Sequence, residues 1–390
     1  MLMQQAYQIS ADEENSMAWQ HILRLARSLG ASDVHWSTGE MPWIRIDGQL
    51  QRMTCWCEPH ARNFDAMTQV MGAQGVREIR AALLNSHDLS NSPPVPRAQH
   101  PNNLDFAVSW PGLGRLRVNA FDQARGPALA LRLIANQIPD LVQLKAPACV
   151  ANWGLQRHGL VLITGPTGSG KSTLLAALLH QINMHRHAHI LTLEDPIEFI
   201  HAPLTSLVHQ REVGRDTPDF ESGLRAALRE DPDVLLVGEL RDSVTIKLAL
   251  TAAETGHLVL ATLHTASAPQ ALDRLVDAFP SHEREGVRAL FAECLVAVLA
   301  QTLCPHRSGQ GRVAAHEIMV ATPAVRNLMR EGKVSQLYAL LQTGQAVGMQ
   351  TLDQSLLRLF HSQEISLKTL ERLRKYPQNP KLMDNQGLED

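Results

Sequence analysis

Cysteine is scarce in this chain of 390 residues. Five cysteines are present, an odd number, and none of them forms a C-x-x-C pair. We therefore expect no disulfide framework, and an odd count without a secretion signal fits a reducing compartment such as the cytosol. The 18 histidines show no metal-binding spacing such as H-E-x-x-H, so we expect no zinc site.

Long apolar runs and basic blocks are also absent. No run approaches the roughly 20 residues that a membrane-spanning helix needs, and residues 1–15 carry Gln, Asp and Glu where a signal peptide has a basic region and an apolar core. The net charge of −3 does not indicate a polyanionic partner, so no nucleic acid is expected. These features predict a soluble, cytoplasmic protein that meets a membrane only through protein partners.

The composition that remains is globular, with 44% apolar and 19% charged residues. Helical spacing of apolar residues over 17–29 opens a first domain, and Asp47-Gly48 between alternating apolar residues predicts a tight hairpin. The rest of this domain reads as a helix around 64–84, an exposed loop at 88–103, and strands at 104–110, 115–121 and 128–134. These elements predict a compact α+β unit over residues 17–137.

The second half alternates strands and helices. Strands are expected at 159–164, 189–193, 233–238 and 257–262, and helices at 171–184, 219–230, 242–254 and 267–278. Because the strands are continuous apolar runs, they predict a parallel α/β sheet buried on both faces. We expect a linker at 138–152, an α/β domain at 153–372 that is mostly helical from Glu283 onward, and a tail without fixed structure at 373–390.

The motif around which this half is organised reads G-x-x-x-x-G-K-S. It stands between an expected strand and an expected helix, which is the context that a phosphate-binding loop requires. Backbone N–H groups of such a loop surround the nucleotide phosphates at the helix N-terminus. We expect Lys171 to bind the β- and γ-phosphates and Ser172 to coordinate Mg²⁺. The nucleotide-binding residues expected here are Gly165, Pro166, Thr167, Gly168, Ser169, Gly170, Lys171, Ser172 and Thr173.

Acidic residues follow two of the expected strands, at the edge where open α/β sheets bind ligands. Glu194 and Asp195 end the strand that begins at His189, and carboxylates there can hold Mg²⁺-bound water or neutralise an arginine. Glu239 follows a buried apolar run, where a carboxylate can orient an attacking water. The alternative for each is a surface or helix-capping carboxylate, and it is strongest for Glu198.

Two histidines flank the next expected strand. His264 stands at its carboxyl end, in a position to sense a γ-phosphate or to bridge to Glu239, and His257 stands at its amino end. A histidine packed in the core is the alternative for both.

Arginines gather on the last strands of the first domain. Arg115, Arg117, Arg125 and Arg132 could act as fingers on a neighbouring subunit's nucleotide, since a guanidinium neutralises phosphate charge in the transition state. A solvated strand face explains any one of them equally well.

Four ordered segments carry a resemblance to a known superfamily. GPTGSGKST, LEDPIEF, LREDPDVLLVGELRD and TAAETGHLVLATLHT closely resemble the Walker A, Asp, Walker B and His boxes of the secretion-superfamily ATPases. These enzymes drive type II secretion, type IV pili and some type IV secretion systems, and the resemblance extends from about residue 19 to residue 370.

Within that superfamily the chain is similar to the twitching-motility retraction branch, the PilT-like proteins. Residues 31–35 and 44–48 are similar to the short N-terminal domain of PAS-like fold, residues 314–318 and 322–333 to the C-terminal signature associated with retraction, and residues 348–356 to the terminal helical element. The four-cysteine zinc module usual in assembly and secretion ATPases is missing, because only Cys304 stands in that region.

The resemblance implies a RecA-like P-loop ATPase domain after a smaller PAS-like α+β domain, acting as a ring hexamer on ATP and Mg²⁺. It implies that Glu239 is the catalytic glutamate, that Arg117 and Arg132 are better finger candidates than Arg125, and that four further residues belong to the Asp and His boxes: Glu194, Asp195, His257 and His264. The implied function is retraction of a type IV pilus, with a membrane platform protein and a paralogous pilus ATPase as partners.

Other functions stay open at this point. The same motor could drive secretion or conjugation, or the chain could be a nucleotide-regulated accessory subunit that does not hydrolyse ATP. DNA translocation suits the loop but not the charge balance. The loop at 88–103, which is longer than the family norm, and the frequent Trp and Cys at 36–57, including Cys55 and Cys57, leave the partner contacts open.

Overall fold

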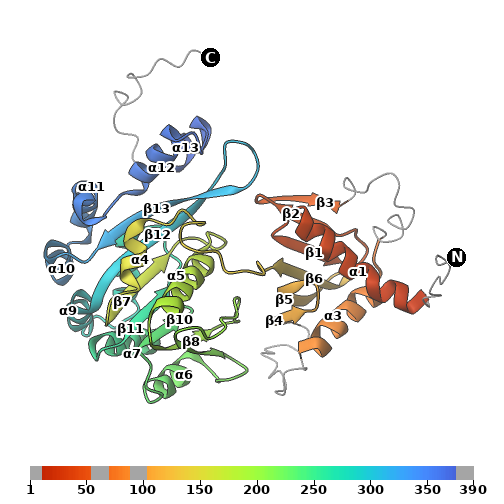
Figure 1. The fold of residues 1–390 in the computed structure, drawn as a ribbon, viewed down its shortest axis with the longest axis horizontal. Helices are drawn as coiled ribbons and strands as arrows, with labels where there is room; N and C mark the ends of the chain where they lie inside the picture. The colour runs from red at the N-terminus through yellow and green to blue at the C-terminus, as the bar shows by residue number, and fades with distance from the viewer. Residues whose placement is uncertain (1–10, 54–69, 88–102, 375–390) are drawn as a thin grey trace, which may run out of the picture. The chain divides into compact units, whose positions relative to one another are not determined.

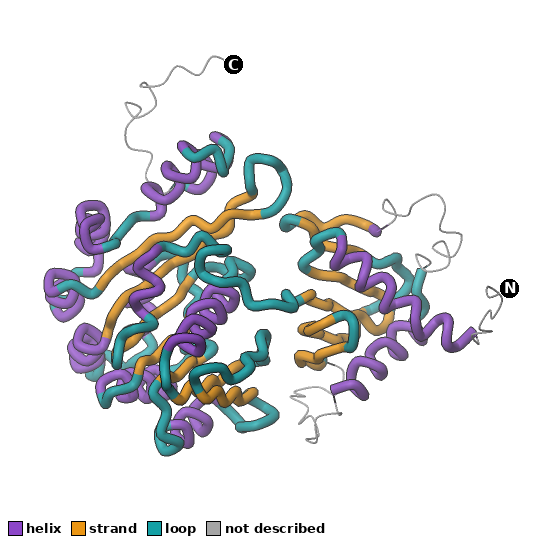
Figure 2. Tube along the Cα trace, viewed as in Figure 1, coloured by secondary structure: helices purple, strands orange, loops and turns teal. Residues whose placement is uncertain are grey.

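A computed structural model of the chain describes residues 11–53, 70–87 and 103–374 (Figures 1 and 2). Cys55 and Cys57 lie outside these residues, as does nearly all of the expected loop at 88–103 and of the expected tail at 373–390. The chain forms two compact units. The first runs to Ile138 and includes the later segments Glu194–His201 and Gln210–Asp219, and the second holds the remainder.

The first unit is an antiparallel sheet of six strands in the order β3-β2-β1-β6-β5-β4. Apolar side chains of two helices, among them Ile22 and Leu83, share one core with Val34, Trp36 and Leu131 of the sheet. The elements are α1 (Ala11–Ser28), β1 (Asp33–Ser37), β2 (Trp43–Ile46), β3 (Gln49–Arg52), α3 (Ala73–His87), β4 (Leu104–Trp110), β5 (Gly114–Gln123) and β6 (Gly126–Leu133).

The predicted hairpin is confirmed by the backbone between β2 and β3. Asp47 and Gly48 have φ values of 48° and 86°, and two successive positive φ values are the requirement of a two-residue turn that matches the strand twist. Strand β1 was not among the predicted strands. It is short and alternates, with Val34 and Trp36 fully buried between half-exposed residues, and its pairing with β2 and β6 defines it.

The second unit contains a sheet of seven strands in the order β13-β12-β7-β11-β10-β8-β9. The pairs β8–β10, β10–β11, β11–β7 and β7–β12 are parallel. Strands β7 (Gly159–Thr164), β10 (Val234–Val237) and β11 (Leu258–Thr262) are buried along their whole length, which confirms the prediction of a parallel sheet covered on both faces. The outer elements on this side are β8 (His189–Glu194) and β9 (Leu207–Glu212), and β9 was not predicted.

The prediction that the chain is mostly helical after Glu283 missed two strands. Strands β12 (Leu295–Pro305) and β13 (Arg312–Val320) form an antiparallel pair that extends the sheet beyond β7. A continuous apolar run rich in alanine, such as residues 295–300, has no periodicity that separates a buried strand from a buried helix. Pairing with β7, a contact distant in sequence, decides for the strand.

Helices surround this sheet (Figure 1). Those before β12 are α4 (Ala148–Trp153), α5 (Lys171–His185), α6 (Phe220–Ala227), α7 (Ser243–Glu254), α8 (Ala268–Asp277) and α9 (Arg284–Cys294). Those after β13 are α10 (Pro323–Arg330), α11 (Leu337–Thr343), α12 (Leu352–His361) and α13 (Leu367–Leu373), with the short 3₁₀ turns η2 (Val334–Gln336) and η3 (Gly344–Val347). The expected linker at 138–152 contributes Leu141 and Val150 to the core of the second unit.

A buried histidine in β13 gives the second unit a pH-dependent stability. Burial lowers the pKa of His316 to about 4, from its ordinary value of 6.5. Below pH 6.5 the unfolded chain therefore binds a proton that the folded chain does not, so folding stability falls as the pH drops from about 6.5 and the loss is complete below about 4. We expect His316→Gln to remove on the order of 1 kcal/mol of this loss at about pH 5.5.

The measurement is urea unfolding of the wild type and His316→Gln at about pH 7 and pH 5.5. The same substitution at His158, which is exposed, is the control and should leave the difference between the two pH values unchanged. An equal loss of stability in the wild type and His316→Gln would contradict the assignment.

Candidate active site

The phosphate-binding loop joins β7 to α5 and takes its shape from three glycines. Gly165, Gly168 and Gly170 have φ values of 140°, 76° and 86°, a region that residues with side chains rarely adopt. Space also matters at two of them. A Cβ on Gly165 would lie 2.3 Å from the carbonyl oxygen of Gln301, and a Cβ on Gly170 would lie 2.8 Å from Gln301 Nε2. The sequence interpretation did not single out Gln301, because a glutamine inside an apolar run carries no motif.

The start of α5 follows directly from the loop. The N-cap residue of α5 is Gly170, which has no side chain that could cap the helix. The backbone N–H groups of the first helical turn are therefore left to bind an anion. Ser172 and Thr173 lie in that turn. Ser169 Oγ is buried and has no hydrogen-bond partner among the described residues. The loop therefore presents donors and glycine backbone in the arrangement that a nucleotide phosphate requires.

Lys171 is almost fully buried, with 7% of its surface exposed. Its Nζ donates to the carbonyl oxygens of Gly165 at 2.7 Å and Pro166 at 3.0 Å, and it lies 3.3 Å from His264 Nδ1. The ammonium group is thus held above the loop by two backbone carbonyls and a histidine that follows β11.

Glu239 stands directly beyond the carboxyl end of β10. Its Oε1 lies 3.5 Å from His264 Nε2, and its Oε2 lies 2.7 Å from the Arg241 guanidinium. Because a lysine ammonium can only donate, His264 Nδ1 accepts from Lys171, which leaves the ring proton on Nε2, facing Glu239. The structure therefore brings Lys171, His264 and Glu239 into one polar chain at the carboxyl ends of three parallel strands.

His257 does not join this cluster. It precedes β11 at the amino end of the strand, where its Nδ1 donates to the carbonyl oxygen of Ala252 at 2.9 Å. Strand β11 runs between His257 and His264, so the two histidines lie at opposite edges of the sheet. The contact of His257 with the end of α7 is structural.

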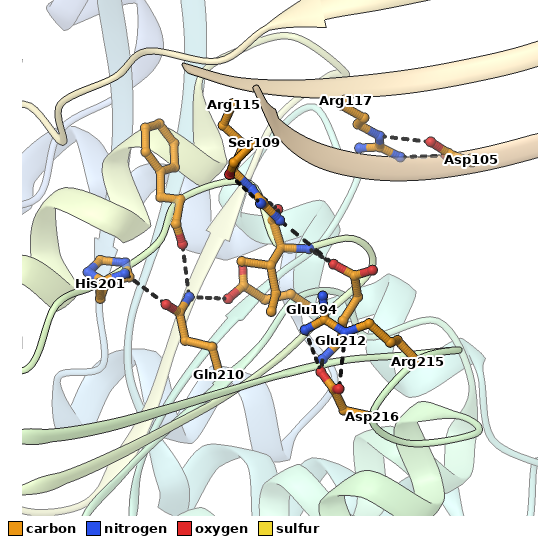
Figure 3. A network of polar contacts seen from close by, with 12 residues as sticks. Asp105, Ser109, Arg115, Arg117, Glu194, His201, Gln210, Glu212, Arg215 and Asp216 are labelled. Atoms are coloured by element: carbon orange, nitrogen blue, oxygen red, sulfur yellow. Dashed lines mark hydrogen bonds and ion pairs between the residues drawn. The ribbon is translucent and has the colours of Figure 1, made fainter. Parts of the chain in front are cut away.

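Glu194, the last residue of β8, and Asp195, which follows it, belong to the first unit. Glu194 Oε1 accepts from Gln210 Nε2 at 3.2 Å, and the same Nε2 lies 2.9 Å from the carbonyl oxygen of Phe199 (Figure 3). The peptide bond between Asp195 and Pro196 is cis. Gln210 thus connects the two segments that the first unit takes from the second half of the chain.

Arg115 holds the first of these segments, residues 194–201, by hydrogen bonds (Figure 3). Its Nε and Nη2 donate to the carbonyl oxygen of Ile197 at 2.9 and 2.7 Å, and Glu212 Oε2 accepts from the Ile197 backbone N–H at 3.0 Å. Burial lowers the pKa of Arg115 and the Glu212 carboxylate opposes that change. Arg115 is therefore a structural residue of the first unit.

The finger candidates Arg117 and Arg132 lie directly opposite each other on β5 and β6. Arg117 Nη2 is 3.0 Å from Asp105 and its Nη1 3.4 Å from Glu198, while Arg132 Nε is 3.0 Å from Asp33. Arg125, which lies between them in the chain, pairs with Glu40 at 2.9 Å. Carboxylates thus offset the repulsion between the guanidinium groups of Arg117 and Arg132. The side chain of Arg132 is 43% exposed.

The glycines of the loop allow a direct test of its geometry. We expect Gly170→Ala to lower the affinity for ADP by roughly tenfold or more, because the new Cβ meets Gln301 in addition to the backbone strain. Gly168→Ala meets the same kind of strain but no atom within 4 Å, so its loss should stay below about tenfold. Calorimetric titration of both variants with ADP makes the comparison, and equal losses would show that the contact with Gln301 does not matter.

Comparison with known proteins places this site in a family. Residues 20–366 match the family model described as type II/IV secretion system protein. The chain is 45% identical over 358 residues to a type IV pilus retraction ATPase, PilT, of Pseudomonas aeruginosa, covering 92% of this chain and 98% of that one. It is 48% identical to a twitching motility protein of Neisseria gonorrhoeae over 88% of this chain and 86% of the relative.

A solved structure of the pilus retraction motor PilT with bound ADP superimposes with a TM-score of 0.76 at 38% identity, covering 92% of this chain and 97% of that one. The ATPase DotB of Legionella pneumophila gives a TM-score of 0.74 at 29% identity, over 91% and 94% of the two chains. The shared fold is a small antiparallel domain followed by a mostly parallel α/β domain and C-terminal helices. This chain therefore belongs to the type II/IV secretion system protein family, as an ATPase of the PilT-like kind.

Proposed function

We propose that this protein is a motor that hydrolyses ATP as a ring hexamer and thereby drives disassembly of a type IV pilus. ATP hydrolysis is supported by the polar chain beside the phosphate-binding loop. Lys171 Nζ lies 3.3 Å from His264 Nδ1, and His264 Nε2 lies 3.5 Å from Glu239 Oε1. The PilT-like sequence over nine-tenths of the chain supports the retraction part.

The residues present fit ATP and Mg²⁺. Three loop glycines with positive φ suit a triphosphate, as does the Ser169 hydroxyl, which has no hydrogen-bond partner in the part of the chain that the structure describes. Lys171 and Ser172 are the residues that would hold the β/γ-phosphates and the metal ion. When bound, Mg²⁺ neutralises charge on the phosphates. Glu194 and Asp195 are proposed to hold water of the metal ion.

Glu239 is the proposed catalytic residue. A carboxylate there accepts a hydrogen bond from a water molecule and orients it for in-line attack. The His264 Nε2–H fixes one of its oxygens and Arg241 the other, so the carboxylate is positioned before substrate arrives. His264 also faces Lys171, and it therefore links the group that binds phosphate to the group that orients water.

Domain motion is the proposed output of hydrolysis. We propose domains at 17–137 and 153–372, joined by 138–152. Because Leu141 and Val150 are part of the second core, the linker is expected to bend near its start, and the chain would also have to bend where it enters and leaves 194–201 and 210–219. Release of the first domain after hydrolysis would be a hinge transition.

The proposed setting is the cytoplasmic face of the inner membrane, reached through a pilus platform protein and shared with a paralogous pilus ATPase. Within the described part of the chain, no helix is both long enough and apolar enough to cross a bilayer. Attachment through a protein partner is consistent with that observation.

The first test is ATP hydrolysis by Glu239→Gln. Replacing the carboxylate with an amide keeps its size and removes its charge, so we expect binding of ATP to persist while turnover falls by roughly a hundredfold or more. Steady-state hydrolysis with light scattering in each nucleotide state measures turnover and assembly together. The exposed Glu285→Gln serves as the control and should turn over like the wild type.

A wild type that binds ATP and hydrolyses no more than Glu239→Gln would exclude the motor. The accessory, non-hydrolysing subunit would then be the correct assignment. A hexamer that hydrolyses ATP but leaves pilus retraction unchanged when deleted would favour the secretion or conjugation alternative.

The finger assignment is testable by mixing subunits. We expect Arg132→Ala to lower turnover by on the order of a thousandfold without weakening ADP binding, because a finger acts on transition-state charge. If the arginine acts on a neighbour's ATP, mixing Arg132→Ala with Lys171→Ala subunits should restore part of the activity. Some interfaces then combine an intact Lys171 from one subunit with an intact Arg132 from the next. Arg77→Ala, which replaces an exposed arginine of α3 that is not a finger candidate, is the control. No recovery on mixing would place Arg132 outside the site of the next subunit.

A further inference from the structure

Gln301 lies against the phosphate-binding loop because of strand register. Strand β12 pairs in parallel with β7 up to Ala300 opposite Thr164, so the next residue of β12 lies beside Gly165, where the loop begins. The Gln301 backbone faces Gly165, and its side-chain amide faces Gly170. One strand residue thus limits the side-chain space at both ends of the loop.

The Gln301 side chain also bonds the loop directly. Its Nε2 donates to the carbonyl oxygen of Ser169 at 2.6 Å, and Gln301 is only 5% exposed. A carbonyl oxygen can only accept, so the nitrogen of the amide must face Ser169. The oxygen Oε1 then faces the other neighbour of the side chain, His316 Nε2, at 3.0 Å.

His316 completes the contact from the next strand. It lies directly opposite Gln301 in the antiparallel β12–β13 pair and is 4% exposed. Because Gln301 Oε1 can only accept, His316 Nε2 carries the ring proton. Burial keeps the ring neutral at neutral pH, with a pKa lowered to about 4, so the contact is a neutral hydrogen bond with a defined direction.

The backbone of His316 is held by two residues that follow β13 in the chain. Its N–H donates to Ser355 Oγ of α12 at 3.0 Å, and its carbonyl oxygen accepts from Gln350 Nε2 at 2.9 Å. Hydrogen bonds therefore run without a break from α12 through His316 and Gln301 to Ser169 in the loop. A chain of buried groups that are all satisfied holds each member more firmly than an isolated bond does.

We propose that Gln301 and His316 are positioning residues of the ATPase, which hold the Ser169–Gly170 peptide group in the orientation that binds the nucleotide phosphates. In a planar trans peptide the C=O and N–H groups point in opposite directions. Anchoring the Ser169 carbonyl toward β12 therefore aims the Gly170 N–H away from β12, and backbone N–H groups are the phosphate ligands of such a loop. The role rests on binding of nucleotide by this loop.

The experiment uses the full-length protein and measures the ADP dissociation constant together with KM and kcat for ATP. Gln301→Met keeps the length of the side chain and removes both hydrogen bonds, and His316→Phe keeps a ring without a donor. We expect each variant to weaken ADP binding and raise KM by about tenfold, with kcat changed less. The double variant should be no worse than either single variant, because the same chain of bonds is already broken.

Two further variants separate positioning from general stability. His316→Gln retains a terminal N–H donor, so its ADP affinity should stay within about threefold of the wild type. Gln350→Met is the matched control: it makes the same change and removes a bond to His316, but only to its backbone. It should lower the unfolding temperature but weaken ADP binding clearly less than Gln301→Met, because the side-chain bonds of Gln301 and His316 remain.

Unchanged ADP affinity in Gln301→Met would overturn the proposal, as would an equal loss in Gln350→Met or losses that add in the double variant. If His316→Phe does not fold, the comparison of Gln301→Met with Gln350→Met decides alone. In each of these outcomes a wild type that binds ADP and hydrolyses ATP leaves the motor assignment intact, so the two failures are distinguishable.

Discussion

The pairing of β7 with β11 on one side and β12 on the other fixes where the phosphate-binding loop, His264 and Gln301 lie relative to one another. All six residues of β7 are buried, and each apolar side chain so buried contributes about 1.5–3 kcal/mol relative to exposure. Since a shift by one residue would exchange the two faces of the strand, the register is strongly determined. The loop begins where β7 ends, His264 follows the end of β11, and Gln301 extends β12 past the same edge.

Polar groups at this edge form connected sets rather than isolated contacts. On one side of the loop, Lys171 meets His264 and Glu239, and on the other, Gln301 meets His316. In both sets the partner's chemistry fixes the proton of a histidine on Nε2. The site is therefore oriented by imidazoles whose donors point in defined directions. The lysine, whose long side chain could otherwise adopt many rotamers, is held by backbone carbonyls.

The first unit includes segments that lie far from the rest of it in the sequence. Residues 194–201 and 210–219 belong to it although the first of them begins with the last residue of β8, a strand of the second sheet. The Arg115 guanidinium contacts that first segment through the carbonyl oxygen of Ile197. No local sequence pattern predicts that these segments belong to the first unit, because the assignment depends on a contact between Arg115 of β5 and a backbone carbonyl some 80 residues later. The Asp-box residues Glu194 and Asp195 are carried by these segments.

Local sequence determined the parts of this protein whose physics is local. The loop glycines, the positive-φ turn at Asp47-Gly48 and the fully apolar strands β7, β10 and β11 could be recognised because backbone conformation and burial on both faces leave a direct mark on residue choice. Tertiary structure alone decided that residues 295–305 and 312–320 are strands, that His264 meets Lys171 and Glu239, and that Gln301 contacts the loop with His316 behind it. Those outcomes depend on strand register and on neighbours distant in the chain, and a short apolar run or a single polar residue does not encode either.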